Sequence, residues 1–99
     1  MIDTLKRVAR EVLPEHSKLY LYGSRARGDA SEDSDWDLLI LLDKPNITLD
    51  DFNVAYPFRE AGWDMGEEIN PQVYSMDEWK RYSFTPFYKN VEHDKQVLL

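Results

Sequence analysis

The sequence predicts one small α/β domain in which helices flank a mixed β-sheet. Two observations carry this prediction. Segments with apolar residues at helical spacing alternate with short runs of aliphatic and aromatic residues, and such alternation is typical of α/β folds. The chain of 99 residues also suits one hydrophobic core and leaves no room for a second. We therefore expect a single domain over residues 1–99, although the pattern does not indicate which strands pair.

The first half of the sequence predicts one helix and two strands. Apolar side chains recur every three or four positions from Ile2, which predicts an amphipathic helix that ends near Pro14. An aromatic and aliphatic run begins at Lys18, stops at Gly23 and predicts the first strand. Residues 36–42 are almost wholly apolar, so they predict a strand buried on both faces at the centre of the sheet.

The second half of the sequence predicts a further strand among helices. A helical pattern follows Thr48 or Asp50, either of which has the short side-chain oxygen of a helix cap. Pro57 then requires a kink in that helix or a later start. The remaining segments are predicted as a third strand, a helical turn and a final helix: residues 68–75, 76–82 and 86–95.

The composition excludes several classes of site and partner. The chain has no cysteine, which rules out disulfides, thiolate metal sites and cysteine nucleophiles. Nineteen acidic and twelve basic residues give a net charge of −7, which argues against direct nucleic-acid binding and suits a basic partner protein better. No stretch approaches the roughly 20 apolar residues that cross a bilayer. We therefore expect a cytoplasmic protein that does not enter the membrane.

Two carboxylates stand at the start of the second predicted strand. Asp35 and Asp37 flank Trp36, and alternation along a strand directs both carboxylates to one face, roughly 7 Å apart. Because like charges at this spacing repel each other, the pair favours a cation. Magnesium prefers a few carboxylates together with water and phosphate oxygens. The pair therefore predicts a magnesium site, and the simpler interpretation places Asp35 in a loop and Asp37 at an exposed strand edge.

A glycine and a serine mark the turn that follows the first predicted strand. Gly23 lets the backbone approach a ligand, and the N–H groups at the start of a short helix from Ser24 are free to bind an anion. Arg25 and Arg27 follow in the same turn, and guanidinium groups pair with phosphate oxygens. These four residues predict a nucleotide-binding turn. The simpler interpretation is an exposed basic turn whose glycine only ends a strand.

Together, the two motifs resemble the signature of the DNA polymerase β nucleotidyltransferase superfamily. The matching residues are Leu21-Tyr-Gly-Ser-Arg-Ala-Arg-Gly28 and Asp35-Trp-Asp-Leu-Leu-Ile40, with ten residues between Ser24 and Asp35. The small size is similar to that of the minimal nucleotidyltransferases of bacteria and archaea. The specific motifs lie within residues 21–42, whereas the length and element order match over most of the chain. The resemblance implies a polymerase-β-like nucleotidyltransferase fold.

The resemblance also implies an activity. Family members move a nucleoside monophosphate from a triphosphate, here expected to be ATP, to a hydroxyl of a protein or other acceptor. Gly23 and Ser24 would hold the triphosphate, and Asp35 and Asp37 would bind magnesium, expected as two ions. Minimal members are often encoded beside an all-helical toxin of the HEPN type, which implies an antitoxin. We expect no acceptor domain in a chain of this size, so a partner or a second subunit of a homo-oligomer would supply the acceptor.

The sequence departs from the family pattern at the third catalytic carboxylate, which lies on a later strand. The expected place holds Asn70, Pro71 and Gln72. Glu68 shares a face with Asn70 and is the catalytic candidate if that face meets the aspartate pair. Its simpler interpretation is an exposed glutamate, and Pro71 indicates an edge strand or a bulge. Without a third acid, the alternative function is a degenerate nucleotide-binding module that neutralises a partner by direct binding.

Overall fold

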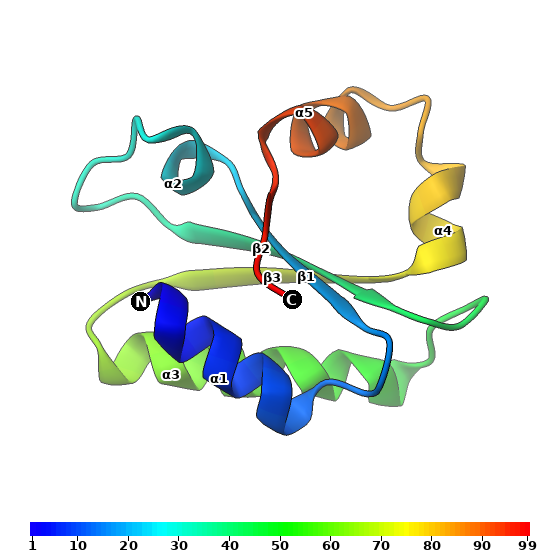
Figure 1. Cartoon of the computed structure of the whole chain (residues 1–99), viewed down its shortest axis with the longest axis horizontal. Helices are drawn as coiled ribbons and strands as arrows, with labels where there is room; N and C mark the ends of the chain where they lie inside the picture. Colours follow the sequence, from blue (N-terminus) through cyan, green and yellow to red (C-terminus); the bar gives the residue numbers. More distant parts are fainter.

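A four-stranded mixed sheet forms the middle layer of the structure, a computed structural model that describes residues 1–99 (Figure 1). The strand order is β3-β2-β1-β4. The central strands β1 (Lys18–Tyr22) and β2 (Trp36–Leu42) are antiparallel, and β4 (Gln96–Val97) is antiparallel to β1. The edge strand β3 (Ile69–Ser75) is parallel to β2. The predicted small mixed sheet is thus confirmed.

Helices cover both faces of this sheet, as predicted (Figure 1). One face is covered by α1 (Ile2–Val12), the 3-10 helix η1 (Leu49–Ala55) and α3 (Tyr56–Asp64). The short helix α2 (Ser24–Arg27), α4 (Met76–Arg81) and α5 (Pro86–Asp94) lie on the other. None of the helices combines the length and the apolar character that crossing a membrane would require.

The core is built on the two faces of β2. Leu38, Ile40 and Leu42 pack with residues of α1 and α3 on one side. Leu39 and Leu41 pack with Trp79 and Val91 of α4 and α5 on the other. Because burial of each such aliphatic side chain contributes about 2 kcal/mol, five consecutive buried residues hold β2 firmly between the helix layers. The apolar run therefore predicted a central strand correctly.

The segment around Pro57 resolves the choice left open by the sequence. The backbone N–H of Thr48 donates to Oδ2 of Asp51 at 2.6 Å, which stabilises the start of η1. Pro57 lies in the first turn of α3, where its missing N–H removes no helical hydrogen bond. The helix consequently starts later, at Tyr56, rather than kinking, and it continues to Asp64. β4, which the sequence did not predict, adds a short strand near the C-terminus.

Candidate active site

The turn after β1 holds the backbone of Gly23 against the carboxylate of Asp37. Gly23 has a φ of 75°, a backbone angle that residues with a Cβ atom rarely adopt. A Cβ atom at Gly23 would lie 2.5 Å from Oδ2 of Asp37, closer than real contacts allow. Both the positive φ and the close approach of the Asp37 carboxylate therefore require glycine at position 23. The two motifs that the sequence singled out are therefore in direct contact.

The first turn of α2 leaves hydrogen-bond donors free beside this contact. The N–H groups of Ala26 and Arg27 each donate to the carbonyl of Gly23 at 3.0 Å. The N–H groups of Ser24 and Arg25 make no hydrogen bond within the chain. Unpaired N–H groups at the start of a helical turn attract anions. The turn therefore offers donors to a phosphate where the sequence predicted them.

Asp37 lies in a row of polar side chains that crosses three strands. The strand register pairs Asp37 with Tyr22 of β1 and with Asn70 of β3. Nδ2 of Asn70 donates to Oδ1 of Asp37 at 3.2 Å, while Oδ2 lies against Gly23. The carboxylate is thus held on one side by an amide and on the other by the glycine turn.

The electrostatics of this row favour a bound cation. Burial raises the pKa of Asp37, and the nearby charge of Asp35 raises it further. The hydrogen bond from Asn70 opposes these effects and lowers the pKa of Asp37. Burial, together with the charge of Asp37, raises the pKa of Tyr22 to about 12, so this phenol is neutral near pH 7. A cation between the two aspartates would offset the cost of keeping both ionised.

Arg25 holds the loop that leads to Asp35. Its guanidinium donates to the carbonyl of Ser34 from Nε and from a terminal nitrogen, at 3.3 and 3.0 Å. The same group lies over the ring of Trp36, 4.6 Å from its centroid, and 3.7 Å from Glu67. These contacts give Arg25 a structural role that the sequence did not predict. Its predicted contact with a phosphate stays a prediction.

Arg27 ties α2 to the C-terminal end of the chain. It donates to Asp94 of α5 at 2.8 Å and to Asp29 at 3.2 Å. Gln96 of β4 also donates to the carbonyl of Ala26. No sequence pattern links positions this far apart, so Asp94 and Gln96 cannot be identified from the sequence. Arg27 too is paired within the chain, and its phosphate contact likewise stays a prediction.

The place beside Asp37 on β3 is taken by Asn70 rather than by an acid. Glu68 precedes β3, where its carbonyl accepts a hydrogen bond from Trp36 at 2.9 Å. Its side chain is exposed and makes no hydrogen bond or ion pair within the chain. No three His, Asp or Glu side chains are grouped so that they could hold a metal ion. If the pairing of β2 with β3 is continued by one residue, Glu68 lies beside Asp35. The catalytic role of Glu68 stays a prediction.

The remaining donor set for a metal consists of Asp35 and Asp37. Asp37 is half-buried and Asp35 is exposed at the end of the loop. A pair of carboxylates open to solvent matches the preference of magnesium for few protein ligands plus water and phosphate oxygens. Chemically, the arrangement can bind a phosphate through the turn and a divalent cation through the aspartates, side by side.

Comparison with known protein families gives one match, to the family described as nucleotidyltransferase domain, over residues 2–99. No curated protein sequence matches the chain.

Solved structures with the same fold extend this match. A toxin–antitoxin structure with AMP-PNP has a TM-score of 0.70 at 17% identity. The aligned region covers 99% of this chain and 72% of the chain in that structure. A candidate nucleotidyltransferase from Sulfolobus solfataricus has a TM-score of 0.64 at 25% identity, covering 98% and 78%. A double Asp-to-Glu variant of the toxin–antitoxin MntA-HpeT has a TM-score of 0.68 at 15% identity, covering 100% and 73%. These likenesses confirm the predicted fold.

The contact between Gly23 and Asp37 predicts unequal effects of two glycine substitutions. Gly23 and Gly28 both have positive φ, but a Cβ atom at Gly28 would meet nothing within 4 Å. Gly28→Ala should therefore cost only the backbone strain, about 1–2 kcal/mol. Gly23→Ala should cost clearly more, because the backbone of Gly23 (φ 75°, ψ −158°) lies outside the left-handed helical region of Gly28 and because the new methyl group also displaces the Asp37 carboxylate. Equal losses in the free energy of unfolding by urea would contradict the contact.

Proposed function

Because the chain belongs to the nucleotidyltransferase domain family, we propose that it transfers AMP from ATP to a hydroxyl acceptor in a magnesium-dependent reaction. The observation that carries this proposal is the contact between Gly23 and Asp37. It sets the free N–H groups of Ser24 and Arg25 beside a carboxylate whose burial favours a cation. A triphosphate and its magnesium ion are the natural joint ligands of such a site.

The residues present fit magnesium. Asp37 accepts one hydrogen bond from a neutral amide, and no lysine or arginine forms an ion pair with either aspartate of the pair. Both carboxylates therefore have oxygen atoms available to a hard cation. When bound, magnesium would neutralise charge on the triphosphate and on the departing pyrophosphate. We propose that Asp35 and Asp37 hold the ions, two in number as the family resemblance implies.

The proposed reaction exchanges a phosphoanhydride bond of the triphosphate for a phosphate ester bond to the acceptor. The acceptor oxygen bonds to the α-phosphorus, the bond from that phosphorus to the bridging oxygen breaks, and pyrophosphate leaves. The acceptor proton passes to water or to a site carboxylate, for which Glu68 remains a candidate. In this scheme Gly23 and Ser24 hold the triphosphate, and Asn70 orients Asp37. Arg25 positions the loop that carries Asp35.

We further propose that the acceptor belongs to a protein partner and that residues 1–99 act as one domain. Two similar structures are toxin–antitoxin assemblies, and one of them contains AMP-PNP. The other carries Asp-to-Glu changes at two positions that are two residues apart, the spacing of Asp35 and Asp37. These likenesses support an antitoxin that acts on a toxin partner. That the toxin is helical and of the HEPN type is what the family resemblance implies.

One observation favours a second candidate function. Asn70 occupies the position beside Asp37 and carries no charge, so the site has one ionisable group fewer than the family pattern. With a neutral amide there, nucleotide and one magnesium ion would bind without efficient transfer. The chain would then neutralise its partner by direct binding alone.

A label-transfer experiment tests the enzymatic proposal. The chain is incubated with ATP labelled at the α-phosphate, with magnesium, and with or without the product of the adjacent gene. Label should appear on the acceptor, and Asp37→Asn should lower the rate by about 100-fold or more, because it removes a metal ligand. Asp43→Asn, the same change at an exposed position just after β2, should leave the rate unchanged. Equal transfer by wild type and Asp37→Asn would refute the assignment.

A gain-of-function substitution separates the two candidate functions. Asn70→Asp adds an acid beside Asp37, so it should raise label transfer in the presence of magnesium if an ion at this position limits the rate. The same change at an exposed position of α5, Asn90→Asp, should have little effect. Unaltered transfer in Asn70→Asp, together with undiminished partner binding in Asp37→Asn, would favour the binding module instead.

A further inference from the structure

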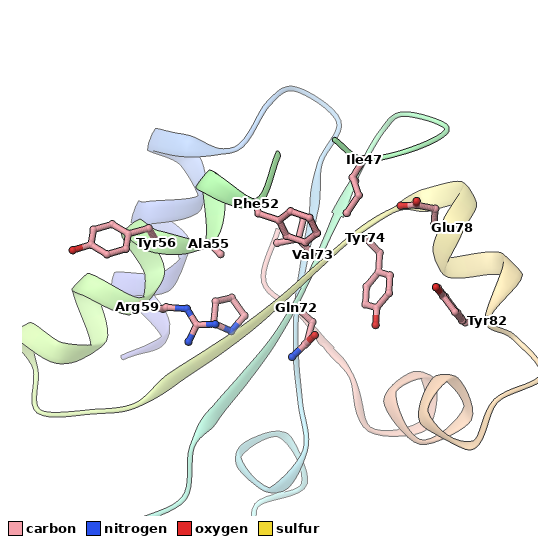
Figure 2. A pocket seen from close by; sticks show the side chains of 11 residues that line it. Ile47, Phe52, Ala55, Tyr56, Arg59, Gln72, Val73, Tyr74, Glu78 and Tyr82 are labelled. Carbon is pink, nitrogen blue, oxygen red and sulfur yellow. The ribbon is translucent and has the colours of Figure 1, made fainter. Parts of the chain in front are cut away.

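A groove of about 590 Å³ runs along the free edge of β3, outside the site described above (Figure 2). β3 ends the strand order, so β2 pairs with only one of its sides. Figure 2 shows Phe52, Tyr56 and Arg59, from η1 and α3, on one wall of the groove. Tyr74 of β3 and Tyr82, just after α4, form the opposite wall. We call this feature the β3-edge groove.

The floor of the β3-edge groove is a row of backbone groups that point away from the sheet. Because the carbonyl of Glu68 accepts a hydrogen bond from Trp36, the even-numbered residues of β3 direct their backbone groups toward β2. The backbone groups of Pro71 and Val73 therefore face the groove, whereas Ile69 is 1% exposed and does not line it. No hydrogen bond from another element reaches them. Such an edge is a template for a short added strand, here over residues 71–73 or roughly 7 Å.

Two features argue against a second copy of this chain as the occupant. Pro71 is one of the two outward residues in the groove and has no N–H to donate. Two copies paired antiparallel about Pro71 would set proline opposite proline and lose both hydrogen bonds. Each copy also carries a net charge of −7, which opposes self-association. The groove therefore suits a segment of a different protein.

The side chains of the groove indicate the chemistry of that segment. Arg59 makes no hydrogen bond or ion pair within the chain, although its side chain lines the groove. A half-buried, unpaired cation attracts a carboxylate. Phe52, Tyr56 and Tyr82 are 49%, 56% and 45% exposed, so they offer apolar surface on which alternate side chains of an added strand can pack.

We propose that the β3-edge groove binds an extended segment of a partner protein by strand addition. The backbone of the segment pairs with Pro71 and Val73, and an acidic side chain of the segment meets Arg59. Apolar side chains of the segment pack on Phe52 and Tyr82. None of these contacts uses Asp37 or the turn at Gly23, so docking is independent of the proposed transfer reaction.

Selection of peptides on the intact chain tests this proposal. A displayed library of random short peptides is selected on the immobilised protein, and the dissociation constants of the enriched peptides are measured by fluorescence anisotropy. The enriched sequences should alternate apolar and polar residues around one acidic residue. Arg59→Glu should weaken their binding by about tenfold or more, and replacing the acidic residue with lysine should restore binding to this variant. Arg10→Glu, at an exposed position of α1, is the matched control and should change nothing.

A second readout does not depend on any substitution. When an enriched peptide is bound to the wild-type chain, hydrogen exchange of the Val73 amide should slow, because strand addition gives this N–H a partner. The proposal is overturned if exchange at Val73 does not change, if no peptide is enriched, or if Arg59→Glu and Arg10→Glu act alike. Dimerisation of the chain through this groove, seen as a doubled mass that Arg59→Glu abolishes, would also overturn it.

Discussion

The contact between the Gly23 backbone and the Asp37 carboxylate is the constraint on which the site depends. It exists because β1 and β2 are antiparallel neighbours and because the turn between them begins with a residue that has no Cβ atom. The same turn starts α2, which Asp94 and Gln96 tie to the end of the chain. The C-terminal end of the chain therefore contributes to the position of this turn and of the carboxylate beside it.

This geometry also explains why binding and turnover are separate questions. The turn and the aspartate pair supply a phosphate site and a cation site whether or not a reaction follows. Transfer further requires an activated acceptor, and the position that would bring a third charge beside Asp37 carries the neutral amide of Asn70. The β3-edge groove begins at the next residue of the strand, Pro71. A partner docked there would lie close to the site without touching the nucleotide.

The sequence predicted those features whose causes are local. The apolar run of β2, the position of Pro57 in the first turn of α3 and the glycine turn after β1 all depend on residues near them in the chain. Strand register is different, because side-chain alternation gives the face of Glu68 and Asn70 but not which of them lies opposite Asp37. The pairing of Arg27 with Asp94 depends on tertiary packing across 67 positions, which no periodic pattern encodes. The β3-edge groove arises in the same way, from four elements, η1, α3, β3 and α4, that meet only in the fold.

The central claim is that one site binds a nucleotide and magnesium together. Calorimetric titration of the wild-type chain with AMP-PNP tests it most directly, once with magnesium and once with a chelator. Because each ligand would offset the charge of the other, the account predicts a dissociation constant at least about tenfold lower with magnesium. Equal affinity with magnesium and with the chelator, or no binding in either, would contradict it.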